Sequence, residues 1–474
     1  MIKSIAWASF FELLKLLTRI ASVVILARYI PPIEYGVFTG LLIIISFSTV
    51  FTDASFGALL INKKNTSPNF ISSIASLSLF TSLLIYLVLI VNSTGIGIMI
   101  GMPRVSEVIP LLSMVFLFRS MALPGSTKLQ RDQNFYKYSK IEFLSYAVSV
   151  FFIGIPMAFY GYDLYALCSM HFVGELLRTI LFMVESNRNV FIIKVSLLKE
   201  IKEDLQYVLK LCMSEFINRA ALQVDRFMIA KFWGAEQLGF YSRMYYLSSQ
   251  PANIFGNSVS KVFFADFSKY KNDIEYLKKN IINSISLIFI FFYPITLYLS
   301  MIDVQLIRLI LGDTWVEAAN VFGILLLTIP FKLSQKVSAQ ILKSQRSMNS
   351  LIFIQISYLL VAAILIYFMI GSDLESVTYA VLFGYMYISI VMFLFASVTL
   401  GFTIRDYLTV IFKILFIITL CNVLKMYFID LDNSVYQNLF YLLTLTYILL
   451  MPMLYKSART KEVFSNFYDK FFKQ

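Results

Sequence analysis

Charged side chains recur inside segments that are otherwise apolar, and these residues could bind an ionic ligand. The deepest basic ones are Arg19, Arg119, Arg178, Arg219 and Lys332. A basic side chain at the middle of a bilayer costs about 2.5–3.5 kcal/mol on insertion scales. Several of them in one chain predict a hydrated, cationic cavity lined by protein.

The most polar of these segments spans residues 206–230. Its charged and amide side chains follow one another at helical spacing: Glu215, Arg219, Gln223 and Arg226, with Asp225 adjacent. Residues three or four apart share one face of a helix. A polar face of this length predicts a cavity lining, and the alternative for Glu215 and Arg219 is a local ion pair.

Six basic residues are the candidates for substrate binding. A guanidinium matches phosphate oxygens with paired hydrogen bonds, so each arginine is a candidate anion ligand. For Arg19 and Arg119 the alternative is an acidic partner on another helix, and for Arg243 and Lys332 it is snorkelling or interhelical hydrogen bonding. The set is Arg19, Arg119, Arg219, Arg226, Arg243 and Lys332.

Three acidic residues, Asp53, Glu215 and Asp225, are candidate proton or sodium sites. Asp53 ends a polar seam formed with Thr39, Ser46 and Thr49, and its alternative role is to neutralise Arg19 or cap the backbone.

His171 is the only histidine, so no metal site is expected. Glu175 and Arg178, which follow it at helical spacing, are most simply a local ion pair. No cofactor is expected either.

Hydrophobic residues make up 59% of the 474 residues and charged residues 14%, against about 25% charged in soluble domains. A membrane-spanning helix needs about 20 apolar residues, and open backbone is not tolerated in lipid. The sequence therefore predicts an all-α polytopic membrane protein, with a retained first helix and about fourteen spans. These are 8–30, 35–60, 70–91, 108–127, 141–160, 164–184, 206–230, 238–265, 280–302, 318–342, 350–370, 377–400, 407–427 and 438–455.

The formal net charge of +12 would suggest nucleic acid in a soluble protein. Here the loop lysines and arginines gather on one side of the predicted membrane, and the other side holds only Arg104, Lys231 and Arg308. This asymmetry predicts that both termini are cytoplasmic. The partners expected are membrane lipids and an anionic ligand, not nucleic acid.

No segment is suited to soluble catalysis. The sequence has no GxxxxGK[ST], HExxH, CxxC or GxSxG motif, and its predicted outer loops are short. We expect the chain not to be an enzyme; a membrane glycosyltransferase or ligase is the less favoured alternative.

An internal repeat relates LARYIPPIEYGVFTG at 26–40 to IAKFWGAEQLGFYSR at 229–243. The offset of 203 pairs Gly36 with Gly239 and spans six predicted helices, so both halves have the same orientation. Parallel repeats of this kind occur in transporters, with the site between the halves. We expect lobes at 1–205 and 206–400, followed at 401–474 by two further helices and a basic tail.

The sequence resembles the Wzx-type polysaccharide repeat-unit flippases, particularly the branch of colanic-acid-type exporters. Their superfamily also holds multidrug and toxin extrusion antiporters and the lipid II flippase. The resemblance covers nearly the whole chain in order. It is carried by ILARYIPPIEYG at 25–36, DASFG at 53–57, Lys63-Lys64, LQRDQNFYKYSKIE at 129–142, QVDR at 223–226, LGFYS at 238–242 and LILGDTW at 309–315.

This resemblance implies alternating access around a cationic cavity between two six-helix lobes. The implied substrate is an undecaprenyl-pyrophosphate-linked oligosaccharide, flipped to the outer leaflet of the bacterial inner membrane for O-antigen, capsule or exopolysaccharide synthesis. Further partners would be H⁺ or Na⁺ and the polymerase or chain-length proteins. Transport of lipid II, or small-molecule antiport as in the multidrug branch, remains the alternative.

Overall fold

The computed structural model describes the chain except for residues 1, 63–66, 187–197, 430–445, 448 and 451–474. The described residues are helical nearly throughout and contain no strand, which confirms the all-α prediction. The first nine helices are α1 (Ile2–Ala27), α2 (Pro32–Ser48), α3 (Asp53–Asn62), α4 (Pro68–Val91), α5 (Ser93–Ile100), α6 (Val105–Arg131), α7 (Phe135–Ser149), α8 (Ile155–Phe159) and α9 (Asp163–Glu185). The later ones are α10 (Leu198–Lys269), α11 (Ile274–Leu299), α12 (Asp303–Ile310), α13 (Ala319–Leu326), α14 (Ile329–Ser344), α15 (Met348–Tyr367), α16 (Leu374–Thr399) and α17 (Ile404–Ile429).

Helix starts follow local sequence. Pro32 begins α2 and Pro68 begins α4, positions where the missing N–H of proline costs no hydrogen bond. The side chains of Ser67 and Asp373 accept hydrogen bonds from the backbone N–H of Phe70 and Ser376, and so cap α4 and α16.

The helix α10 contains two of the predicted spans, 206–230 and 238–265. Gly234 separates them with a φ of 83°, where the backbone is not helical. Glycine adopts this left-handed region without the steric cost that a Cβ brings. The two spans are therefore successive helices joined by a glycine turn.

Ten helices in the described part of the chain are long and apolar enough to cross a membrane. The total of fourteen stays a prediction, and most of the last predicted run, 438–455, lies outside the described residues.

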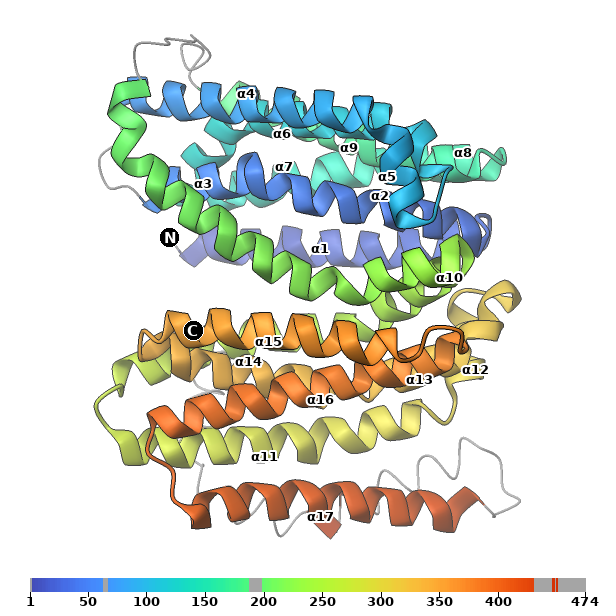
Figure 1. Cartoon of the computed structure of the whole chain (residues 1–474), viewed down its shortest axis with the longest axis vertical. Coiled ribbons are helices and arrows are strands. Elements are labelled where there is room, and N and C mark those ends of the chain that lie inside the picture. The colour runs from blue at the N-terminus through green and yellow to red at the C-terminus, as the bar shows by residue number, and fades with distance from the viewer. Residues whose placement is uncertain (1, 63–66, 187–197, 430–445, 448, 451–474) are drawn as a thin grey trace. The chain divides into compact units, whose positions relative to one another are not determined.

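The chain forms two compact units. Unit 1 contains Met1–Arg243 and Ile307–Glu317, and unit 2 contains Met244–Leu306 and Ala318–Gln474. In unit 1, α6 packs against α4 and α9, and α1 packs against α7, as Figure 1 shows. In unit 2, α14 and α16 are neighbours, with α11 beside α14 and α17. The lobe boundaries at 205/206 and 400/401 stay predictions, because they rest on sequence repetition and not on compactness.

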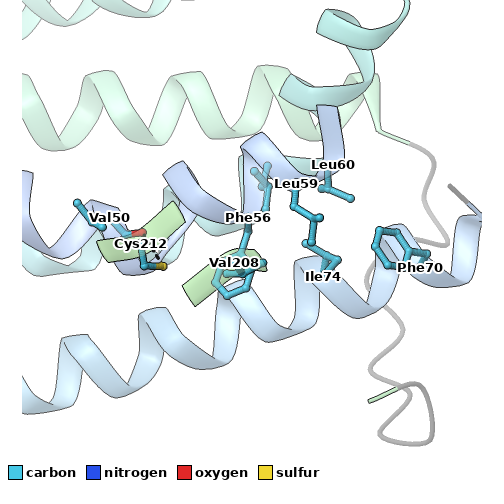
Figure 2. Packing of buried hydrophobic residues seen from close by; sticks show 9 residues of the cluster. Val50, Phe56, Leu59, Leu60, Phe70, Ile74, Val208 and Cys212 are labelled. Carbon is cyan, nitrogen blue, oxygen red and sulfur yellow. Dashed lines mark hydrogen bonds between the residues drawn. The ribbon is translucent and has the colours of Figure 1, made fainter. Parts of the chain in front are cut away.

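One apolar cluster of unit 1 holds α10 in place at Val208 and Cys212. Figure 2 shows Val208 and Cys212 packed among side chains of α3 and α4. The Sγ atom of Cys212 lies 3.7 Å from the carbonyl oxygen of Val50. Further members are Phe56, Leu59, Leu60, Phe70, Ile74 and Leu123. This packing sets the position of the polar face that follows on α10.

Candidate functional site

A chain of ion pairs runs through the interior of unit 1. Glu142 on α7 accepts from Lys15 Nζ at 2.6 Å and from Arg178 Nε at 2.5 Å. Glu175 on α9 accepts from Arg119 at 2.6 Å and lies 3.4 Å from Arg178. Each carboxylate therefore serves two cations, the condition under which a buried ion pair repays its desolvation.

This network confirms the local pair of Glu175 with Arg178 and gives Arg119 the acidic partner that was its alternative role. Sequence reasoning did not connect Lys15 and Glu142 with it. Glu142 lies at the start of the predicted run 141–160. A carboxylate at the end of an apolar run is expected at the interface with water, so the sequence gives no sign that Glu142 is buried.

Arg19 lies beside an aromatic ring of α7, the helix that also carries Glu142. Its guanidinium carbon is 5.7 Å from the ring centre of Tyr146, and the Tyr146 hydroxyl is 3.0 Å from the Ser22 hydroxyl. A ring face attracts a cation. Among the described residues no carboxylate forms an ion pair with Arg19.

The polar face predicted on 206–230 contacts α2 at Arg219. Arg219 donates through Nη1 to the carbonyl oxygen of Ser46 at 3.3 Å. Arg226 donates to Gln223 Oε1 at 3.0 Å. The Nε of Arg219 is buried and has no hydrogen-bond partner among the described residues. The alternative ion pair between Glu215 and Arg219 is not among the ion pairs of the described chain.

The three candidate coupling residues lie in different settings. Asp225 is 3% exposed; its carboxylate accepts from the Tyr241 hydroxyl at 2.6 Å and from the Arg226 backbone N–H at 2.8 Å. The bond to Tyr241 joins the helices on either side of Gly234. Glu215 is half-buried on α10. The side chain of Asp53 lies outside the described residues.

Arg243 stacks on Tyr35, with 3.5 Å between its guanidinium carbon and the ring centre. Tyr35 and Phe240 both contact the buried ring of Trp315, at 5.5 and 5.8 Å. Trp315 Nε1 donates to the Ala27 carbonyl at 2.8 Å. This aromatic packing fixes the ring of Tyr35 on which Arg243 stacks.

An ion pair joins Glu34, the neighbour of Tyr35 in sequence, to Arg104, the residue that precedes α6. Arg104 donates to Glu34 at 2.7 Å, and this hydrogen bond raises the pKa of the Arg104 guanidinium above its ordinary value.

The two copies of the repeat contact each other within unit 1. A Cβ on Gly36 would collide with the backbone of Ala235, and one on Gly239 with the backbone of Pro32. The Thr39 hydroxyl donates to the Ser242 hydroxyl at 3.1 Å, across 203 residues of sequence. The Thr39–Ser242 pairing spans the repeat offset, and in the other two contacts Gly36 meets the equivalent of Pro32 while Gly239 meets Pro32 itself. We call this contact between the two copies the repeat seam.

Lys332 is the predicted site residue that lies in unit 2. Its ammonium is 4.3 Å from the ring centre of Tyr245 and 4.4 Å from that of Tyr385. It donates to the Ser249 hydroxyl at 3.2 Å. Sequence reasoning missed Tyr385, one of 29 tyrosines with nothing local to distinguish it.

Arg19, Arg119, Arg219, Arg226 and Arg243 thus lie in unit 1, and Lys332 lies in unit 2. Whether they share one cavity stays a prediction. The described residues contain no cluster of histidine, cysteine and acidic side chains that could hold a metal ion.

A family model described as "Polysaccharide biosynthesis protein" matches residues 25–320. A Klebsiella pneumoniae protein named "Uncharacterized membrane protein in cps region" is 24% identical over 66% of this chain and 65% of its own length. The Bacillus subtilis teichuronic acid biosynthesis protein TuaB is 23% identical over 59% and 58%. The Escherichia coli lipopolysaccharide biosynthesis protein WzxC is 22% identical over 65% and 63%. The matches thus span less than two thirds of these relatives.

Two solved structures show the same fold. The lipid II flippase MurJ, in its inward closed conformation, has a TM-score of 0.75 at 14% identity and covers 97% of this chain and 100% of its own. An inward-facing multidrug resistance transporter of the MATE family has a TM-score of 0.63 at 12% identity and covers 82% and 94%. Both likenesses concern the arrangement of helices and not the ligand.

Proposed function

Because the chain belongs to the polysaccharide biosynthesis protein family, we propose that it is a flippase for an undecaprenyl-pyrophosphate-linked oligosaccharide. It moves the repeat unit from the cytoplasmic to the outer leaflet of the bacterial inner membrane, for a surface polysaccharide. The names of the relatives support this, since they include biosynthesis proteins for teichuronic acid and lipopolysaccharide and a succinoglycan transport protein. The function is transport and not catalysis.

The observation that carries the proposal is the buried Nε of Arg219, which has no hydrogen-bond partner in the described part of the chain. Buried polar groups nearly always have a hydrogen-bond partner, and an exception needs an explanation. A guanidinium donates in parallel to two oxygens of a phosphate. The pyrophosphate of the substrate would supply acceptors to Arg219, and the sugar would lie beyond it.

In this proposal Arg19, Arg119, Arg226, Arg243 and Lys332 complete the cationic surface around the substrate. Arg119 is already paired with Glu175, so it contributes less to phosphate binding than Arg219 does. The two predicted lobes alternate between inward and outward access, and both termini are cytoplasmic. Cations lining the path lower the cost of moving phosphate charge through a low-dielectric region.

Coupling to H⁺ or Na⁺ would use Asp53, Glu215 and Asp225. Asp225 lies between a tyrosine hydroxyl and a backbone N–H, so protonation would weaken the bond that joins the helices beside Gly234. A polymerase or chain-length protein would then receive the flipped repeat unit.

The test is a deletion strain examined for surface polysaccharide and for lipid-linked repeat units. Loss of polysaccharide with accumulation of lipid-linked repeat units on the cytoplasmic side is the expected result. Arrest of peptidoglycan synthesis with accumulated lipid II would instead identify the chain as a lipid II flippase. Unchanged polysaccharide and unchanged lipid intermediates would contradict flipping altogether.

A further inference from the structure

The hydroxyl of Tyr35 is buried in unit 1 without a hydrogen bond to the protein. Tyr35, on α2, is 1% exposed, and its hydroxyl has no hydrogen-bond partner in the described part of the chain. A buried hydroxyl without a partner destabilises a fold, whereas phenylalanine would fill the same space without that cost. The presence of a tyrosine here therefore needs an explanation other than packing.

A neighbouring indole fixes where this hydroxyl lies. The ring centres of Tyr35 and Trp315 are 5.5 Å apart. Trp315 is itself fully buried and is held by its hydrogen bond to the Ala27 carbonyl. The ring of Tyr35 cannot turn aside without disturbing this packing, so its hydroxyl keeps its position.

A guanidinium lies against the face of the same tyrosine. The central guanidinium carbon of Arg243 is 3.5 Å from the ring centre, which brings its N–H donors close to the Tyr35 hydroxyl at the ring edge. A guanidinium has five N–H donors in a fixed fork, so one anionic oxygen can accept from Arg243 and Tyr35 together. Hydrogen bonds to a charged oxygen are about twice as strong as those between neutral groups.

We propose that the Tyr35 hydroxyl and Arg243 together bind one oxygen of the substrate pyrophosphate. The inference rests on the proposed function, and it adds a neutral donor to the cationic surface. The hydroxyl is closed to solvent in this conformation, so the ligand reaches it at another stage of alternating access. Tyr35 then has two roles: its ring supports Arg243, and its hydroxyl contacts the ligand.

Thermal unfolding of the purified, ligand-free full chain tests the empty state. Tyr35→Phe keeps the ring on which Arg243 stacks and removes only the hydroxyl, so the unfolding midpoint should rise by about 1–3 °C. The control Tyr160→Phe, at a position of unit 1 that is 76% exposed, should leave the midpoint unchanged. An unchanged or lower midpoint for Tyr35→Phe would show that the hydroxyl is already satisfied in the empty protein, for example by an internal water, and would overturn the proposal.

Binding of undecaprenyl pyrophosphate in detergent tests the loaded state. Tyr35→Phe should bind this lipid about tenfold to a hundredfold more weakly than the wild type, the loss expected for one hydrogen bond to a charged group. Tyr160→Phe should bind as the wild type does. Equal binding by Tyr35→Phe and the wild type would overturn the proposal and leave the proposed function standing.

Inorganic pyrophosphate, measured in parallel, separates the inference from the function on which it rests. If the wild type binds inorganic pyrophosphate and loses it in Tyr35→Phe, but does not bind the lipid, the phosphate site stands and the flippase proposal fails. If the wild type binds neither ligand, both proposals are overturned.

Discussion

At the scale of single residues, the basic side chains inside the helices differ in what surrounds them. Lys15, Arg119 and Arg178 share two carboxylates, whereas Arg219 meets a backbone oxygen and Arg19 an aromatic ring. The three cations that share carboxylates stabilise unit 1. Arg219 and Arg19 have donor capacity left for a ligand.

Replacing Arg219 should affect transport far more than protein abundance. Arg219→Ala should abolish surface polysaccharide, because the forked donor to the pyrophosphate is lost. Arg219→Lys should retain part of the activity, since charge persists without the paired geometry. Glycan staining of complemented deletion strains, with immunoblots for abundance, measures both.

The matched control is Arg308→Ala, an exposed arginine paired with Asp313. Exposed ion pairs are worth about 0–1 kcal/mol, so this variant should keep wild-type export. Normal export by Arg219→Ala would show that α10 is not the substrate path.

Glu142→Gln should destabilise unit 1. Lys15 and Arg178 would keep their charges and lose the carboxylate between them, and breaking a buried pair costs about 3–5 kcal/mol. Thermal unfolding in detergent measures the effect. Glu185→Gln, which breaks the more exposed pair with Lys137, is the control, and equal losses would contradict a structural role for the network.

Sequence alone indicates which residues are charged and buried in apolar runs, but not which partners they find. Arg178 and Glu175 share a helix face, so their pairing is predictable from spacing. Lys15 and Glu142 are 127 residues apart, and only the packing of α1 on α7 brings them together. The same holds for Lys332 and Tyr385, which belong to different helices.

At the scale of elements, α2 is bordered by both helical halves of α10. Ser46 on α2 contacts Arg219, and Val50 in the 3₁₀ turn that follows α2 contacts Cys212, both before the Gly234 turn. Thr39 on α2 contacts Ser242 after it. The polar seam predicted on α2 therefore faces protein for much of its length. The hydroxyls of Ser46 and Thr49 also donate to the backbone oxygens of Ile43 and Ser46 one turn earlier, which satisfies them inside a membrane helix.

Gly36→Ala should destabilise the repeat seam, because the added methyl meets the backbone of Ala235, which cannot move aside as a side chain can. Gly95→Ala in α5 is the matched control: nothing lies within 4 Å of its Cβ position, and alanine favours a helix over glycine by about 1 kcal/mol. The midpoint temperature of thermal unfolding should fall for Gly36→Ala, and for Gly95→Ala it should stay level or rise. The opposite order would contradict the close approach.

The apolar runs predict the type and approximate position of most helices, since period and length carry that information. They do not predict the breaks. The run 35–60 is divided by a short 3₁₀ turn at 49–51 before α3, and 141–160 contains a π turn at 150–154. Such irregularities depend on tertiary packing, to which hydropathy is insensitive.

At the scale of the whole molecule, the positive charge of the loops predicts how the chain is oriented in the membrane. Reporter fusions after Gly97, Asp163, Ala235, Ile310, Asp373 and Asn433 should report the outside, and fusions after Tyr270 and Gln474 the cytoplasm. Alkaline phosphatase and fluorescent reporters at each position give complementary signals. An outside signal at Tyr270 would contradict the fourteen-helix topology.

The repeat predicts two similar halves but not how the chain divides into compact units. Residues 206–243 belong by sequence to the second copy, yet they lie in unit 1. The reason is visible in the cluster around Val208 and Cys212 and in the repeat seam. Hydropathy and repetition contain no information on such contacts between the copies.

The repeat seam has the pattern of an isologous interface, in which residue i of one copy contacts j of the other, and j of the first contacts i of the second. Position 36 meets 235 while 239 meets 32, and positions 39 and 242 meet each other. Two identical six-helix subunits related by a twofold axis would make the same contacts. An ancestral homodimer could therefore have been joined into one chain without redesigning this surface. Its two faces should still be interchangeable: a chain with Thr39→Ser and Ser242→Thr together should fold as stably as the natural one.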